Sequence, residues 1–126
     1  MAYKNIHDCF WTDSKVRKLS KDEKLLLLYL ITSPHSHYTG LYYLPQEFMK
    51  LESGVDPDKI IPSLEAKGFI RYDPDNLVIW IRNMATYQMT GKSKSLIQGA
   101  VRHLESLETL LTEEFREYYS ELLDTL

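Results

Sequence analysis

The stretch that most constrains the fold of this chain is an uninterrupted apolar run, Leu25–Ile31. Just before it, Ser20 and Glu23 stand three residues apart, which matches the capping box at the start of many helices. A helix that is apolar on every side is usually buried on every side. We therefore expect residues 21–33 to form a central core helix that ends at Pro34.

The length of this apolar run argues against a membrane-spanning protein. It is far shorter than the roughly 20 apolar residues that a membrane-spanning helix needs. The N-terminus has no apolar segment typical of a secretory signal, and the single cysteine, Cys9, permits no internal disulfide. We therefore expect a cytoplasmic protein without a membrane partner. With 126 residues, 44% of them hydrophobic, the chain is long enough to bury a core without metals or disulfides.

Short strands and helices are predicted to follow the core helix. Residues 41–44 favour a strand because they hold two tyrosines. A second helix is expected over Gln46–Ser53, with Gly54 as the residue that ends it. A third helix is expected over Asp56–Lys67, with Asp56 as its cap. Pro62 lies inside this third helix, where proline removes a hydrogen bond and is expected to bend the helix or delay its start.

A hairpin is predicted next. Two apolar stretches, 69–72 and 77–82, flank Asp73–Asn76, whose Asp and Pro suit the first two positions of a turn. Residues 83–91 are expected to form a linker. Helical apolar spacing then covers 93–111, and Thr112 is expected to cap a last helix.

This order predicts an α+β fold that is mostly helical, a winged helix-turn-helix with a C-terminal helical extension. We expect residues 1–90 to form the winged-helix domain. Residues 91–126 form the extension, which packs either on that domain or on a partner. Because the helical pattern runs straight to Leu126, we expect a longer natural protein to continue beyond it.

Three stretches resemble one protein family: FWTDSKVRKLS at 10–20, LLLLYLITSPHSHYTGLYYLP at 25–45 and FIRYDPDNLVIWIRNMATYQ at 69–88. They are similar to the N-terminal winged-helix domain of phage replisome organisers, replication-initiation proteins related to DnaD-type primosome proteins. The resemblance implies binding of double-stranded DNA at a phage replication origin and recruitment of a helicase loader or other replication protein. It does not imply an enzyme. The sequence shows no glycine-rich phosphate loop, and we expect no catalytic residues and no cofactor.

Charge is distributed unevenly along the chain, whose net charge is −3. Residues 1–102 hold 14 basic and 11 acidic side chains, whereas residues 103–126 hold one basic and seven acidic side chains. The balance of the first part is therefore +3 and that of the second −6. A whole-chain charge can in this way hide a basic face. The alternative is that the acidic tail is simply a solvated helix.

Candidate DNA-binding residues follow from the predicted fold. The third helix and the hairpin, or wing, are the elements that meet DNA in such domains. Basic side chains contact phosphates, and a serine hydroxyl can contact phosphate or base. Those expected to face outward from the third helix, the wing and the stretch after it are Lys59, Ser63, Lys67, Arg71, Arg82, Lys92 and Lys94. A secondary basic patch holds Lys15, Arg17, Lys18, Lys21 and Lys24. For each residue alone, a solvated surface position is the alternative.

Two further functions stay open. The third helix is net acidic, which favours a protein-interaction or oligomerisation module of the primosome, and a winged-helix transcriptional regulator is a third possibility. In a homo-oligomer or a complex with another replication protein, the expected contacts are Leu107, Leu111, Phe115, Tyr119 and Leu122. Aromatic residues that could stack on single-stranded bases, or instead fill the core, are Trp11, Tyr42, Tyr43, Tyr72 and Trp80.

Histidines and the cysteine do not predict a metal site. His7 and Cys9 are two residues apart, as are His35 and His37, which is unlike the spacing of structural zinc sites. We expect His35 and His37 to face solvent in the loop after the core helix.

Overall fold

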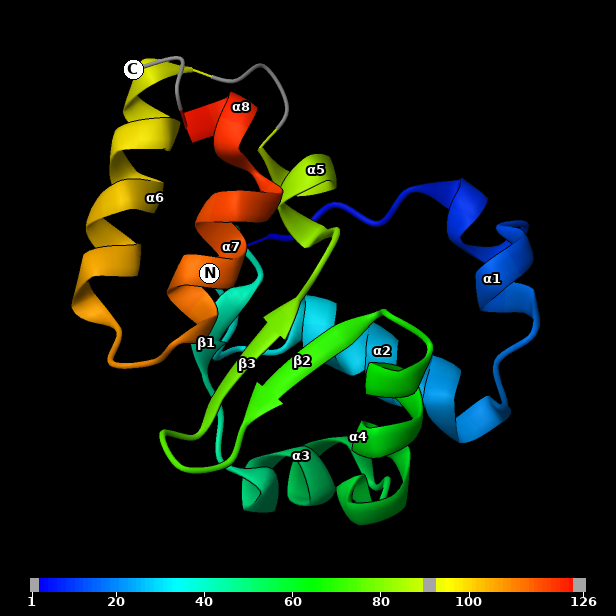
Figure 1. Cartoon of the computed structure of the whole chain (residues 1–126). Helices are drawn as coiled ribbons and strands as arrows, with labels where there is room; N and C mark the ends of the chain where they lie inside the picture. The colour runs from blue at the N-terminus through cyan, green and yellow to red at the C-terminus, as the bar shows by residue number, and fades with distance from the viewer. Residues whose placement is uncertain (1–2, 90–92, 124–126) are drawn as a thin grey trace.

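A three-stranded antiparallel sheet separates two groups of helices in the computed structural model, which describes residues 3–89 and 93–123 (Figure 1). The strands are β1 (Leu41–Tyr43), β2 (Ile70–Asp73) and β3 (Val78–Ile81), and their order in the sheet is β1-β3-β2. β3 pairs with both neighbours, and Trp80 stands opposite Leu41 on one side and Arg71 on the other. The prediction of an α+β fold is confirmed.

The helices fall into an N-terminal and a C-terminal group. The first group is η1 (Asp8–Trp11), α1 (Ser14–Arg17), α2 (Lys21–Thr32), α3 (Gln46–Ser53) and α4 (Pro57–Ala66). The second group is α5 (Met84–Gln88), α6 (Lys94–Ser106), α7 (Leu111–Tyr118) and α8 (Ser120–Leu123). The bounds of α2, α3 and α4 agree with the predicted bounds to within one residue at each end. α4 also continues through Pro62 without a break.

The start of α2 has the predicted capping box. The Glu23 backbone N–H donates to the Ser20 hydroxyl at 3.1 Å, and the Ser20 N–H donates to the Glu23 carboxylate at 3.0 Å. The expectation that this helix is buried on every side is wrong, because Leu25 is 48% exposed. Leu26, Leu27 and Leu30 carry the burial, so an all-apolar run here still has one face open to solvent.

Both faces of the sheet are covered, by different helices. Tyr42, Ile79 and Ile81 share one cluster with residues of α2, α3 and α4. Leu41 and Trp80 belong to a second cluster, which is completed by α5, α6 and α7. A central strand buried on both faces has no polar position, which explains why all four residues of β3 are apolar and buried.

The C-terminal part differs from its prediction in three places. The expected linker 83–91 contains the short helix α5. The expected helix over 93–111 ends at Ser106, where Leu107 turns to an extended backbone. Thr112 caps no helix, because α7 begins at Leu111 without a side-chain cap. The C-terminal extension packs on the sheet of its own chain. The apolar spacing continues from α6 into α7 because both helices bury residues in the same cluster.

Candidate nucleic-acid interface

The third helix, α4, offers few of the outward groups that the sequence predicts. Lys59 is exposed. Ser63 is half-buried and the Lys67 side chain is 44% exposed, and both bind Glu23 of α2. The Ser63 hydroxyl donates to this carboxylate at 2.9 Å, and the Lys67 ammonium donates to its two oxygens at 2.7 and 2.9 Å. Both side chains therefore already have a partner within the chain, which competes with their predicted contact with DNA.

The Glu23 carboxylate is buried and therefore needs these hydrogen-bond partners. Its side chain is 7% exposed, and burial alone raises the pKa of a carboxyl. The hydrogen bonds from Lys67, Ser63 and the Ser20 backbone outweigh the burial and lower the pKa of Glu23 to about 2. The carboxylate stays charged and joins the start of α2 to the end of α4.

The hairpin predicted to be the wing has two arginines on it or beside it, and the C-terminal extension contacts both. Arg71 on β2 lies 3.2 Å from the Glu114 carboxylate of α7. Arg82, just after β3, has its guanidinium 5.5 Å from the ring centre of Trp80 and 5.8 Å from that of Tyr118. Such distances favour a cation–π contact. These two arginines thus contact groups of this chain. The negative charge of Glu114 would repel the negative phosphates of DNA.

The other predicted residues are divided between surface and core. Lys94 is exposed at the start of α6, and Lys92 lies outside the described residues. Among the predicted partner contacts, Leu111 and Phe115 are 4% and 0% exposed because they pack on the sheet of their own chain, so they offer no outer surface. Leu107, Tyr119 and Leu122 are partly buried against the same cluster.

The secondary basic patch is the surface on which accessible cations lie closest together in the sequence, whereas Lys59 and Lys94 are exposed singly. We call it the basic surface: Lys15, Arg17, Lys18, Lys21 and Lys24, on α1, its C-cap and the start of α2. Four of these residues are exposed and Lys24 is half-buried. Within residues 3–89 and 93–123, no carboxylate lies within ion-pair distance of any of them. The Asp13 side chain accepts the backbone N–H groups of Lys15 and Val16, which starts α1 at this place.

Three of the five aromatic residues considered for stacking on bases fill the core. Trp80, Tyr42 and Tyr72 are at most 9% exposed, whereas Trp11 and Tyr43 are 57% and 55% exposed. The core alternative therefore holds for the first three, and their rings are closed to bases.

The two loop histidines have structural surroundings. His37 does not face solvent but stacks on His103 of α6, with ring centres 3.6 Å apart. Burial first, and the charges of His103 and Lys4 after it, lower the pKa of His37 to about 4. Burial also lowers the pKa of His103, although its ring N–H donates to the Leu41 carbonyl at 2.6 Å.

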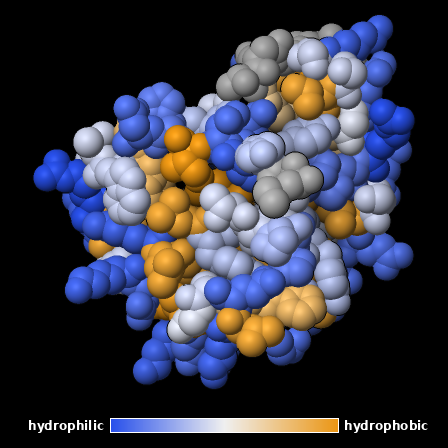
Figure 2. Space-filling model, turned by 180° about the vertical axis from the view of Figure 1, so that it is seen from behind, coloured by the Kyte–Doolittle hydropathy of each residue, from blue (hydrophilic) through white to orange (hydrophobic). Residues whose placement is uncertain are grey.

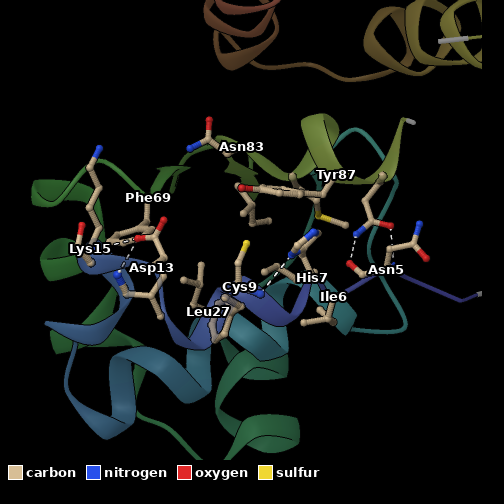
Figure 3. A pocket seen from close by; sticks show the side chains of 17 residues that line it. Asn5, Ile6, His7, Cys9, Asp13, Lys15, Leu27, Phe69, Asn83 and Tyr87 are labelled. Carbon is tan, nitrogen blue, oxygen red and sulfur yellow. Dashed lines mark hydrogen bonds between the residues drawn. The ribbon is translucent and has the colours of Figure 1, made fainter. Parts of the chain in front are cut away.

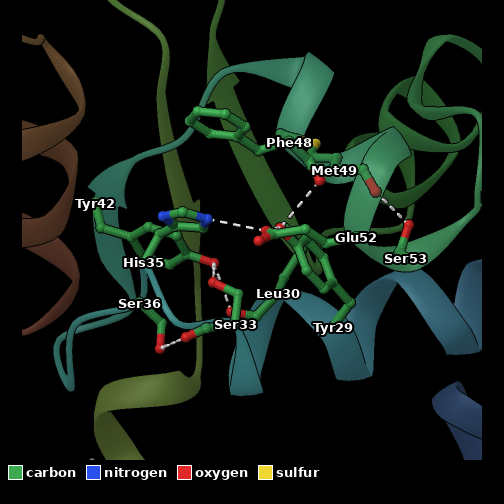
Figure 4. A network of polar contacts seen from close by, with 10 residues as sticks. All are labelled: Tyr29, Leu30, Ser33, His35, Ser36, Tyr42, Phe48, Met49, Glu52 and Ser53. Carbon is green, nitrogen blue, oxygen red and sulfur yellow. Dashed lines mark hydrogen bonds and ion pairs between the residues drawn. The ribbon is translucent and has the colours of Figure 1, made fainter.

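His35 belongs to a polar network at the end of α2 (Figure 4). Its Nε2 lies 2.9 Å from the Glu52 carboxylate, and its ring stacks on Phe48. The Tyr29 hydroxyl donates to the same carboxylate and is the main cause that lowers the pKa of Glu52. The network fastens α3 to α2 and the loop after it, so we assign it a structural role.

Sequence reasoning missed a groove beside the basic surface (Figure 3). This N-terminal groove has a volume of about 240 Å³ and lies between residues 5–16, α2 and α5. The following residues line its apolar part: Phe10, Val16, Leu27, Ile31, Phe69, Ile81 and Met84. Viewed from behind, the surface shows orange apolar side chains gathered beside blue polar ones, with a dark hollow among them (Figure 2). The apolar residues before β2 and after β3 were the available sign of this groove. Their contact with residues 5–16 joins segments far apart in the sequence, so no local pattern predicts it.

Comparison of the chain with protein-family models, with curated proteins and with solved structures gave no match. The described residues include no group of three or more histidine, cysteine or acidic side chains that could hold a metal ion. None of their helices combines the length and the apolar character needed to cross a bilayer.

Proposed function

We propose that this chain is the winged-helix DNA-binding module of a phage-type replication initiation protein, and that it binds duplex DNA through the basic surface. The succession α2, β1, α3, α4, β2, β3 supports the winged-helix assignment, because a helix pair followed by a hairpin is the arrangement of such domains. The resemblance of residues 10–20, 25–45 and 69–88 to replisome organisers supports the role at a replication origin.

One observation carries the proposal: the accessible cations are concentrated at α1 and α2. Lys67 is bound by Glu23, and Arg71 by Glu114. The cations of the basic surface have no such carboxylate among the described residues. DNA affinity comes largely from protein cations that replace condensed counterions at phosphates. We therefore expect DNA to bind where several cations lie together without a carboxylate partner.

The mechanism is phosphate binding with little reading of bases by α4. Lysine ammonium groups act as point charges on phosphates, and Arg17 can bind a phosphate through two N–H groups. The exposed residues of α4 include Asp58, Lys59, Pro62 and Ala66. One of these four is a cation and one is an anion, so this face has few groups that pair with base edges. We expect a low preference for sequence by the isolated chain.

The test is fluorescence anisotropy of a labelled duplex at low and at moderate salt, with the unaltered chain and with Lys18→Glu/Lys21→Glu. We expect binding that weakens as salt rises, and a loss of about 100-fold in affinity for the double variant. Arg116→Glu, an exposed cation of the acidic α7, is the matched control and should change affinity by less than about threefold.

Two outcomes contradict the proposal. Equal binding by the double variant and the unaltered chain removes the basic surface from the interface. Absence of duplex binding at both salt concentrations favours the second candidate function, an interaction module of the replication machinery, for which the N-terminal groove is the specific observation.

A further inference from the structure

We propose that the N-terminal groove is a docking site for a partner protein, and that its occupant is an acidic peptide segment with one large apolar side chain. The apolar side chain would fill the groove, and the acidic residues beside it would meet the basic surface. This proposal goes beyond DNA binding, because the apolar lining of the groove needs no nucleic acid, and the rim of the groove shares Lys15 with the basic surface.

The lining of the groove decides between an apolar side chain and a nucleobase. Its deeper part consists of hydrocarbon and aromatic groups such as Leu27, Ile81 and Met84, each about 3% exposed. A nucleobase whose polar edge met only these apolar groups would lose hydrogen bonds, which costs free energy. A leucine, phenylalanine or tryptophan side chain has no such cost apart from the single indole N–H, so the apolar occupant fits better.

The rim of the groove favours an acidic neighbour for that side chain. Lys15 lines the groove and belongs to the basic surface at the same time. Asp13 also lines the groove, but its carboxylate accepts the backbone N–H groups of Lys15 and Val16, which offsets its charge. Arg17 and Lys18 follow Lys15 on α1 and its C-cap. Carboxylates on the occupant would therefore face cations, which favours association.

The groove is already formed without its occupant. Two hydrogen bonds fasten residues 5–16 to α5: the Asn5 N–H donates to the Gln88 side chain at 2.8 Å, and the Gln88 amide donates to the Asn5 carbonyl at 2.6 Å. Ile6 and Tyr87 line the opening and are 40% and 45% exposed. A preformed site with apolar side chains at its entrance lowers the ordering cost of binding. Such a pocket suits the anchor residue that dominates many interfaces.

Cys9 provides a direct way to test the site. It is the single cysteine of the chain, it is exposed, and it lines the groove with its sulfur directed into it (Figure 3). A bulky maleimide attached there should block the groove while the basic surface stays unaltered. A random-peptide display library is selected on the whole chain and counter-selected on the maleimide-treated chain, and the recovered peptides are measured by anisotropy.

We expect the recovered peptides to hold one large apolar residue flanked by Asp or Glu. Their affinity should fall about tenfold or more with Tyr87→Ala and with Lys15→Glu, and should not change with Lys50→Glu, a lysine outside the groove. Circular dichroism of each variant separates lost binding from lost folding.

Each of three results with the peptides overturns the proposal. The library yields no peptide that prefers the untreated chain, or the recovered peptides lack acidic residues, or Tyr87→Ala leaves their affinity unchanged. Displacement of the peptides by a single-stranded oligonucleotide, which binds less well after maleimide treatment, would also overturn it and indicate a nucleic-acid occupant.

Discussion

The basic surface and the wing carry the same kinds of side chain, yet the surroundings of their cations differ. On the wing, Arg71 meets Glu114 and Arg82 lies between Trp80 and Tyr118. At α1 and α2, no described carboxylate lies within ion-pair distance of the cations. The difference comes from packing between segments far apart in the sequence, because α7 brings the Glu114 carboxylate to Arg71 of β2. A cation is therefore available for a ligand only where the fold has not already supplied a counterion.

Among the ion pairs within the chain, breaking the one between Glu23 and Lys67 should have the largest effect on stability. Glu23→Ala removes the capping box and leaves Lys67 and Ser63 without their acceptor. We expect a loss of about 3 kcal/mol in the free energy of unfolding, which urea denaturation measures. Asp22→Ala, the exposed neighbour, is the control and should cost less than about 0.5 kcal/mol. Equal losses in the two variants would contradict the role given to Glu23.

The same pair predicts a loss of stability in acid. The pKa of Glu23 is lowered from 4.5 to about 2, so the folded state binds this proton less readily than the unfolded state. The stabilisation is complete above the unfolded pKa of 4.5 and is lost as pH falls from there toward 2. Unfolding curves at several pH values should show this loss in the unaltered chain. The loss should be smaller in Glu23→Ala, and identical pH profiles would argue against it.

The contact between His37 and His103 should weaken at a milder pH. The pKa of His37 is lowered from 6.5 to about 4, so the folded state holds the neutral ring. Stability is complete above 6.5 and falls as pH drops from 6.5 toward 4, by about 3 kcal/mol in total.

Hydrogen exchange of the α6 amides measures this effect, because His103 lies on that helix. Faster exchange at pH 5 than expected from chemistry alone, and its absence in His37→Asn, would support the account. Exchange of α6 that does not respond to pH in this range would contradict it.

Breaking the wing pair should have the smallest effect. Arg71 and Glu114 have 46% and 40% of their side-chain surface exposed, and exposed ion pairs contribute little because solvent screens them. Glu114→Gln should change the free energy of unfolding by less than about 0.5 kcal/mol. Because it removes a negative charge beside the wing, it should raise DNA affinity by about twofold. Glu117→Gln, also on α7, is the control, and a larger gain there would contradict a local effect.

The sequence was sufficient to predict the elements of the N-terminal half. Ser20 with Glu23, Gly54, and Asp56 with Pro57 are local signals, and each coincides with an observed helix boundary. The C-terminal half was harder because its packing is not local. The four apolar residues of β3 were the clearest available sign that helices cover both faces of the sheet, since a strand with one wet face alternates.

The candidate site could be predicted less well than the fold. Ser63 and Lys67 lie off the apolar stripe of their helix, which correctly predicted that they are outside the core. That pattern could not predict that Glu23 of another helix would bind both. Glu23 was seen as a helix cap, and its second role depends on the approach of α4 to α2. The N-terminal groove combines segments 5–16 and 83–88, which no spacing in the sequence connects.

The most direct test of the account is an NMR titration of the isotope-labelled chain with a short duplex at low salt, followed through the backbone amide signals. We predict that the amide signals of residues 15–24 shift most and that those of residues 57–67 and Arg71 shift little. The largest shifts on α4 and the wing, with residues 15–24 unchanged, would contradict it and return the interface to the third helix.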